Sequence, residues 1–340
     1  MKSKKIIAMI MAALLMLLSF AACSGDTTDE VTTEPETASD AAETDAINVS
    51  VLKGPTGMGA AYMWTKSDSG ETEYTYNFTL DTDATTVGPK LMTGEYDIAS
   101  IPTNLAASLY QKSGGKVKVV AVNTLGVLYL VTKDNAVSSL EDLRGMTILA
   151  SGQGTIAEYA LNYVLESYGY EIGTDVTIEF STEHSESVTK ALAGGYDVVL
   201  LPEPYVTQII NQDSSFSVAI NLTEEWENLG SCTLTMGCIA VNSDFYDSNP
   251  EAVASFIADY RESAEYVNAN PAEASLLIEE HDIMTASVAA SAIPNSNIVC
   301  YTGETMKAAL ESCFTVLYSQ DASIIGGAMP DDDFYIYVEE

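Results

Sequence analysis

Five short segments of the sequence carry glycines or polar side chains that suit hydrogen bonding to a small molecule. They are residues 54–58, 102–104, 152–155, 183–184 and 203–205. Glycine lets the backbone approach a ligand closely, and free N–H groups at the start of a helix can bind polar or anionic groups. We therefore interpret these segments as candidate ligand-binding loops. The candidate residues are Gly54, Pro55, Thr56, Gly57, Met58, Pro102, Thr103, Asn104, Gly152, Gln153, Gly154, Thr155, Glu183, His184, Glu203 and Tyr205.

Each segment also has a structural interpretation that the sequence leaves open. Residues 54–57 can form a plain turn between a strand and a helix, and Thr103 with Asn104 can cap a helix. Glu203 stands between two prolines on a stiff turn, where its carboxylate can be aimed at a ligand or simply solvated. His184 can be the neighbour of a helix cap instead of a ligand-binding residue.

The sequence lacks the motifs that most enzymes and nucleotide-binding proteins need. Residues 152–155 do not form a dinucleotide fingerprint, because its third glycine is absent, and no Walker A pattern occurs. The histidines, His184 and His281, are far apart in the chain, and the cysteines have no metal-ligand spacing. We predict no catalytic residue, no metal and no cofactor, and keep an enzyme on the same fold as the alternative.

The elements that must position these segments follow from hydrophobic patterning. Apolar, β-branched runs alternate with amphipathic stretches from Ile47 onward, which predicts mainly parallel sheets covered by helices on both faces. Thr155 with Glu158 predicts one helix start, and the Asn249-Pro250 and Asn270-Pro271 pairs predict two more. Predicted strands are residues 47–52, 74–80, 97–101, 117–122, 127–132, 147–150, 176–180, 197–201, 217–220 and 236–241.

All the candidate segments lie where a predicted strand gives way to a helix. In open α/β sheets, ligands bind beyond the carboxyl ends of the strands, so these positions agree with a binding site. The strand-helix units form two sets, followed by a helical block. We predict a first lobe of residues 47–124 plus 242–340, and a second lobe of residues 125–241. Residues 124–132 and 234–242 are the predicted crossover strands of a hinge.

The N-terminus predicts export and lipid anchoring. Three lysines precede an apolar run at residues 6–20, which is shorter than a membrane span and typical of a signal peptide, residues 1–22. Small residues directly before Cys23 resemble a bacterial lipobox, which implies that Cys23 is lipidated and anchors the protein in the membrane. Residues 23–46 are acidic and poor in apolar residues, so we predict a disordered tether. A sensory surface lipoprotein is therefore a further alternative.

The net charge limits the classes of partner, and the cysteine content leaves the disulfide state open. The net charge of −35, from 14 Lys+Arg against 49 Asp+Glu, excludes binding to nucleic acid or to anionic lipid through a basic patch. An exported chain can form disulfides, but a core of this size can also keep its cysteines as buried thiols. The cysteines whose state stays open are Cys232, Cys238, Cys300 and Cys313.

Four stretches resemble the substrate-binding proteins of ABC importers, in the nitrate/sulfonate/taurine and thiamine-precursor superfamily. They are residues 51–59 (VLKGPTGMG), 97–106 (DIASIPTNLA), 145–155 (GMTILASGQGT) and 197–205 (DVVLLPEPY). The resemblance implies type II periplasmic-binding-protein lobes joined by a hinge, with the ligand held between them. It also implies a monomer on the extracytoplasmic face of the bacterial membrane, with permease and ATPase subunits as partners.

The residue types in the candidate loops favour an organic ligand over a small oxyanion. Lys53 is the cation in these loops, whereas Glu183 and Glu203 are carboxylates that would repel a dianion and favour an amino group. We therefore predict a thiamine-like or pyrimidine-like heterocycle, with an alkanesulfonate bound at helix N-termini as the alternative. Aromatic residues that could stack on a ring are Tyr62, Trp64 and Tyr205.

Overall fold

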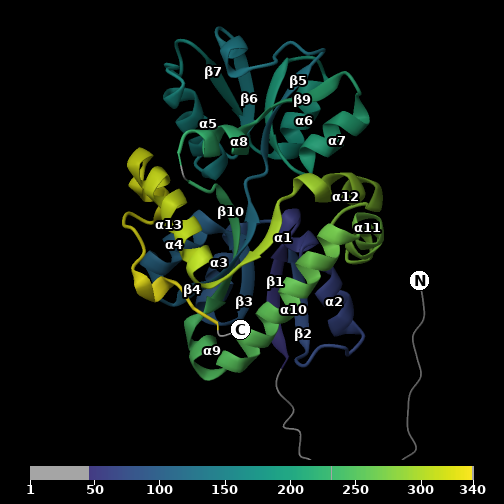
Figure 1. Ribbon diagram of the computed structural model, residues 1–340, viewed down its shortest axis with the longest axis vertical. Coiled ribbons are helices and arrows are strands. Elements are labelled where there is room, and N and C mark those ends of the chain that lie inside the picture. Colours follow the sequence, from purple (N-terminus) through teal and green to yellow (C-terminus); the bar gives the residue numbers. More distant parts are fainter. Residues whose placement is uncertain (1–45, 231, 339–340) are drawn as a thin grey trace, which may run out of the picture. The chain divides into compact units, whose positions relative to one another are not determined.

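The computed structural model describes residues 46–230 and 232–338 (Figure 1). The predicted signal peptide, Cys23 and all but the last residue of the predicted tether lie outside the described residues. Within the described part of the chain, no helix is both long and apolar enough to cross a membrane.

The first sheet has six strands in the order β11-β4-β10-β3-β1-β2. Strands β1, β2 and β3 run parallel, whereas β10 is antiparallel to both β3 and β4, and β11 is antiparallel to β4. Residues 235–241, placed in the second lobe by the sequence-based division, thus pair within this sheet. The strands are β1 (Ile47–Leu52), β2 (Tyr76–Asp81), β3 (Ile98–Pro102), β4 (Val117–Leu125), β10 (Thr235–Asn242) and β11 (Ile298–Tyr301).

The second sheet has five strands in the order β7-β6-β8-β5-β9. Its central strands β6 and β8 are parallel neighbours, and β5 is antiparallel to both β8 and β9. The chain enters this sheet directly from β4 through residues 126–127, which confirms a strand crossover between two α/β lobes. The strands are β5 (Leu128–Lys133), β6 (Thr147–Ser151), β7 (Thr177–Ser181), β8 (Val198–Pro202) and β9 (Phe216–Asn221).

Helices connect the parallel strands and form the C-terminal block. Those that connect strands are α1 (Pro55–Met58), α2 (Ala61–Asp68), α3 (Ala84–Thr93), α4 (Thr103–Ser113), α5 (Ile156–Ser167), α6 (His184–Leu192), α7 (Tyr205–Gln212) and α8 (Leu222–Asn228). The later helices are α9 (Ser243–Ser248), α10 (Pro250–Ala269), α11 (Pro271–Glu280), α12 (Ala286–Ala292) and α13 (Gly303–Gln320). Short 3₁₀ helices are η1 (Leu140–Leu143), η2 (Ile293–Asn295), η3 (Ala322–Ile325) and η4 (Asp332–Phe334).

The predicted helix starts are correct in position, but two of the caps work differently from the prediction. Thr155 caps α5 by accepting a hydrogen bond from Ala157 N at 3.3 Å. The side chains of Asn249 and Asn270 make no such bond to the helices that follow them. Each donates backward instead, Asn249 to Phe245 O at 3.1 Å and Asn270 to Tyr266 O at 2.9 Å. They therefore satisfy carbonyl groups at the end of the preceding helix.

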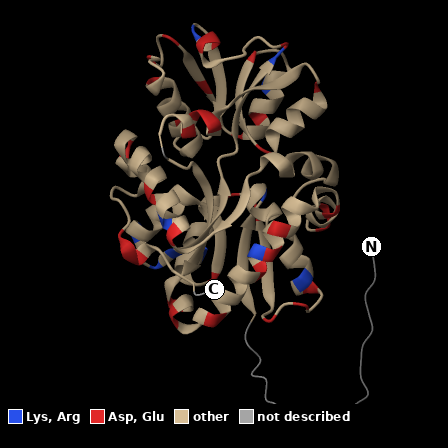
Figure 2. Cartoon of the chain, in the orientation of Figure 1, with Lys and Arg blue, Asp and Glu red and all other residues tan. Residues whose placement is uncertain are grey.

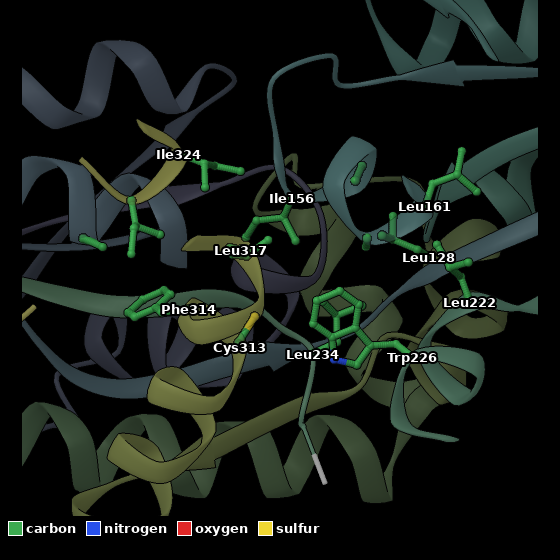
Figure 3. Close-up of a cluster of buried hydrophobic side chains, with 14 of the residues drawn as sticks. Leu128, Ile156, Leu161, Leu222, Trp226, Leu234, Cys313, Phe314, Leu317 and Ile324 are labelled. Atoms are coloured by element: carbon green, nitrogen blue, oxygen red, sulfur yellow. The ribbon is translucent and has the colours of Figure 1, made fainter. Parts of the chain in front are cut away.

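One hydrophobic core runs through both lobes next to the crossovers. Phe314 and Leu317 of α13 belong to the same cluster as Ile156 of α5 and Trp226 of α8 (Figure 3). Each lobe also has a smaller core of its own, on the other side of its sheet. Cys238 and Cys313 are buried free thiols, as the interpretation without disulfides predicts, whereas Cys232 and Cys300 are only half-buried. The shared core holds the hinge side of the two lobes together.

Candidate functional site

A cavity of about 820 Å³ lies between the two sheets, at the ends of their strands. Its walls come from both lobes, and its floor includes residues of both strand crossovers. Among the predicted ligand-binding residues, those that line it are Gly54, Pro55, Thr56, Pro102, Gly152, Glu183, His184, Glu203 and Tyr205. Segments that are far apart in the sequence therefore meet at one cleft, as a ligand site beyond the strand ends requires.

The other predicted residues lie beside the cleft without lining it. Gly57 and Met58 are the buried residues of α1, and Thr103 is buried, where its hydroxyl donates to Thr235 O at 3.0 Å. Asn104 follows Thr103 on α4 and is half-buried. In the loop before α5, Gln153, Gly154 and Thr155 are exposed. The helix cap considered for Thr103 and Asn104 is not observed, since α4 begins after Pro102 without a side-chain cap.

Some cleft residues were missed from the sequence. Thr124, Met236 and Gly237 come from the crossover strands, and Thr82 and Asp83 come from the junction of β2 and α3. The β2–α3 junction has the same strand-to-helix character as the chosen segments, and Asp83 caps α3 by accepting from Thr85 N at 2.8 Å. That cap could have identified the β2–α3 junction as a candidate segment from the sequence. No sequence signal marks the crossover residues, because they lie within regular strands.

The first-lobe wall is built by close backbone packing around Thr56. The Thr56 hydroxyl donates to Leu52 O at 3.4 Å, and a Cβ on Gly57 would lie 2.4 Å from the same carbonyl oxygen. A Cβ on Gly237 would lie 2.6 Å from Asn123 Oδ1 and 2.8 Å from Thr56 Cγ2. Glycine at these positions therefore lets the β1–α1 turn sit directly against the crossover strand. The result is a narrow floor of backbone and hydroxyl groups.

The second-lobe wall presents a neutral imidazole next to a phenol ring. His184 opens α6, and its Nδ1 is hydrogen-bonded to Ser151 Oγ at 2.5 Å. Burial lowers the pKa of His184 to about 4, so the ring is uncharged at neutral pH. The ring centroid of Tyr205 lies 5.1 Å from that of His184. The two ring planes are inclined by 43°, so each ring offers its own face to a ligand.

Glu203 is the most buried carboxylate of the cleft, with 3% of its surface exposed. Thr207 donates to both carboxylate oxygens, from its backbone N and from its hydroxyl, each at 3.1 Å. Burial raises the pKa of Glu203 to about 7, against the hydrogen bonds from Thr207 and Asn295, which favour the charged form. Its backbone N also donates to Val127 O of the first crossover, at 3.0 Å.

The charge of the cleft is mainly negative. Among the described residues that line it, Lys53 has the one fixed positive charge, against the carboxylates of Asp83, Glu183 and Glu203. Acidic residues also occur throughout both lobes, with far fewer basic ones (Figure 2). A cleft of this charge favours a ligand with an amino or cationic group over a dianion.

Two of the aromatic residues considered for stacking lie elsewhere. Tyr62 stacks on Tyr266 with ring centroids 4.0 Å apart, and Trp64 stacks on His281 at 4.4 Å. Both belong to α2 and pack within the first lobe, away from the residues that line the cleft. Tyr205 is therefore the aromatic ring that the cleft offers. No group of His, Cys, Asp and Glu within the described part of the chain could hold a metal ion.

Comparisons with known proteins agree with this architecture. A solved ABC transporter protein from Parabacteroides distasonis is 22% identical, with a TM-score of 0.73 over 86% of this chain and 99% of its own. The aliphatic sulphonate-binding protein SsuA of Escherichia coli is 17% identical, with a TM-score of 0.68 over 83% and 94%. SsuA from Xanthomonas axonopodis, bound to MOPS, is 15% identical, with a TM-score of 0.62 over 82% and 94%.

Sequence comparison gives the family. A search of curated protein sequences finds no significant match. A family model described as "ABC transporter, phosphonate, periplasmic substrate-binding protein" matches residues 69–277, which is more than half of the chain. The bilobal fold of the solved relatives, which the resemblance predicted, is the fold observed. The chain therefore belongs to the phosphonate family of periplasmic substrate-binding proteins of ABC transporters.

Proposed function

We propose that this protein captures a small organic nutrient in the cleft between its lobes and, as a monomer, delivers it to the permease of its importer. The observation that carries the proposal is the 820 Å³ cavity lined by strand ends of both sheets. Cavities of about 300–1,000 Å³ are typical of small-molecule sites. A ligand that contacts both lobes stabilises the closed arrangement, which is the form that a permease can recognise.

The ligand we propose is a flat heterocycle with an amino or cationic group, such as a thiamine precursor or an aminopyrimidine. Tyr205 supplies a ring face on which a flat molecule can stack, beside the neutral ring of His184. The carboxylates of Asp83, Glu183 and Glu203 supply attraction for positive charge and hydrogen-bond acceptors for an amino group.

An alkanesulfonate is the second candidate ligand. Two solved relatives are named as sulfonate-binding proteins, and the helices α3, α4, α6 and α7 all begin at residues that line or adjoin the cleft. Free N–H groups at helix starts and the ammonium of Lys53 can bind a sulfonate group. The carboxylates of the same cleft oppose this, which is why we place the heterocycle first.

A thermal-shift screen of the mature protein tests the ligand class. The panel is thiamine, aminopyrimidines, taurine, an alkanesulfonate, a phosphonate and nitrate. Binding raises the melting temperature by mass action, by about 4 °C when the free ligand is at about 100 times its Kd. We expect this shift with the amino-bearing heterocycles. A shift with the sulfonate alone would replace the first ligand class by the second, and ligand recovered in chemically altered form would indicate an enzyme.

Lipid anchoring of the mature chain is a separate part of the proposal. It is supported by the sequence Ala21-Ala22-Cys23 after an apolar run. We expect the full-length protein, expressed in bacteria, to partition into the detergent phase of a Triton X-114 extract, and the Cys23→Ser variant to partition into the aqueous phase. The same phase for both proteins would contradict the anchor without affecting the ligand site.

A further inference from the structure

The first crossover passes from one lobe to the other at Gly126 and Val127, between β4 and β5. Before this point, Leu125 N donates to Asn297 O at 3.1 Å, and Asn297 Nδ2 donates to Gly126 O at 2.5 Å. After it, Val127 O accepts a hydrogen bond from Glu203 N, at the end of β8, at 3.0 Å. Two adjacent carbonyl groups of the crossover are therefore held by opposite lobes.

The planarity of the peptide bond turns these contacts into the position of a pivot. The backbone has two soft torsions per residue, and each carbonyl is fixed within its own peptide plane. The plane of Gly126 O is held on the first lobe and the plane of Val127 O on the second, so the φ and ψ angles of Val127 are the torsions between them. The second crossover reaches the first sheet beside the same point, because Thr235 of β10 pairs with Leu125.

Asn297 is well anchored to the first lobe. It lies between η2 and β11 with a left-handed φ of +42°, a conformation that asparagine adopts more readily than most residues. The next residue, Ile298, pairs with Thr124 of β4. Ile298 O also accepts a hydrogen bond from Asn268 Nδ2 of α10, at 2.9 Å. Strand pairing and α10 thus fix the position from which Asn297 holds the Gly126 carbonyl.

The segment that carries Asn297 also bonds directly to the second lobe. Tyr129 lies on β5, two residues beyond the pivot, and its hydroxyl donates to Asn295 O at 3.1 Å. Tyr129 is buried, and neither Tyr129 nor Asn297 is among the described residues that line the ligand cleft. Because rotation about Val127 moves β5 relative to η2, this bond belongs to the arrangement in which both lobes line the cleft.

We propose that Asn297 is a positioning residue for ligand binding, whose carboxamide confines the rotation of the lobes to Val127 and, with the Tyr129–Asn295 bond, favours the arrangement in which both lobes line the cleft. The proposal rests on the proposed function, because closure around a ligand gives that arrangement its role. Asn297 acts on affinity through the lobe equilibrium, since the apparent affinity falls with the population of the binding-competent state.

The first test needs no ligand. In the mature protein, Thr93 and Thr189 are replaced by a spin-labelled unnatural amino acid, which leaves the native thiols intact, and pulsed EPR measures the distance between the labels. Both positions are exposed, on α3 of the first lobe and α6 of the second. These helices follow strands whose ends line the cleft. We expect the distances in ligand-free Asn297→Asp to extend beyond those of wild type.

The variants isolate the hydrogen bond. Asn297→Asp keeps the size of the side chain and the tolerance of a left-handed φ, but replaces the N–H donor by an acceptor. Asn249→Asp is the matched control, because Asn249 Nδ2 donates to Phe245 O at 3.1 Å within the first lobe. Tyr129→Phe removes the other bond and should lengthen the distances as well. Wild-type distances in Asn297→Asp, or the same shift in Asn249→Asp, would overturn the proposal.

The second test uses thiamine as the probe, in isothermal titrations. We expect Asn297→Asp to bind it about three- to tenfold more weakly than wild type, as the loss of one hydrogen bond predicts. Saturation with thiamine should restore the wild-type distances. A purely structural role would lower the melting temperature without changing the distances, and would overturn the proposal. If thiamine does not bind to the wild type, the ligand class fails, and the ligand-free distances still decide the role of Asn297.

Discussion

Replacing Tyr205 by alanine is expected to lower the affinity for a ring-containing ligand by about 10- to 100-fold. The change removes the aromatic ring that lies beside His184 in the cleft wall, with ring centroids 5.1 Å apart. Alanine is a good helix former, so α7 can still begin at this position. Isothermal titration of the mature variant with the ligand found in the thermal-shift screen measures the effect.

Two further variants test whether the loss of affinity in Tyr205→Ala comes from removing the aromatic ring from the cleft. Tyr205→Phe keeps the ring and should bind within a few-fold of wild type, roughly the value of one lost hydrogen bond. Tyr168→Ala makes the same truncation outside the cleft, where Tyr168 is 43% exposed at the end of α5. Its affinity should equal that of wild type. Wild-type affinity in Tyr205→Ala would remove the aromatic wall from the binding site.

Replacing Leu317 by alanine is expected to lower the free energy of unfolding by about 2–5 kcal/mol. The Leu317 side chain has no exposed surface, and it lies in the core that both lobes share, with Ile156 and Trp226 in the same cluster (Figure 3). Truncation leaves a cavity at the hinge side of the molecule, where α13 packs against α5. Urea unfolding of the mature protein, followed by circular dichroism, measures the loss.

Leu276→Ala is the matched control for this prediction. It is the same substitution on α11, at a side chain that is 62% exposed. The expected change is within about 0.5 kcal/mol, because little apolar surface is removed from water there. Equal losses in the two variants would mean that the shared core does not stabilise the protein more than its surface does.

Local sequence patterns were sufficient to predict the type of fold. The apolar runs of β1 and β8 and the Pro-led starts of α10 and α11 are visible in windows of a few residues. Their alternation gives parallel strands, and parallel strands place their loops at one edge of a sheet. That reasoning found Gly54, Thr56 and His184, which do line one cleft.

The same patterns could not tell which junction residues face the ligand. Thr56 and Thr103 both lie in the first turn of a helix that follows a strand, yet Thr103 is buried, with its hydroxyl bonded to Thr235 O, a partner 132 residues further along the chain. Trp64 has an aromatic ring that could stack on a ligand, but it packs on His281 within the first lobe. Each outcome depends on a neighbour that is distant in the sequence and close in space.

The charges of the cleft were likewise predictable from the sequence only in part. The residue types alone indicated that carboxylates outnumber cations there, because ionisable groups can be counted in a sequence. Tertiary structure decided that His184 is neutral, through its burial, and that Glu203 is buried where it accepts hydrogen bonds from Thr207 of the helix that follows it. The pKa of a side chain depends on desolvation and on hydrogen-bond partners. Desolvation and hydrogen-bond partners are set by packing between segments that are distant in the sequence. Hydrophobic periodicity along the chain does not indicate which of these segments meet.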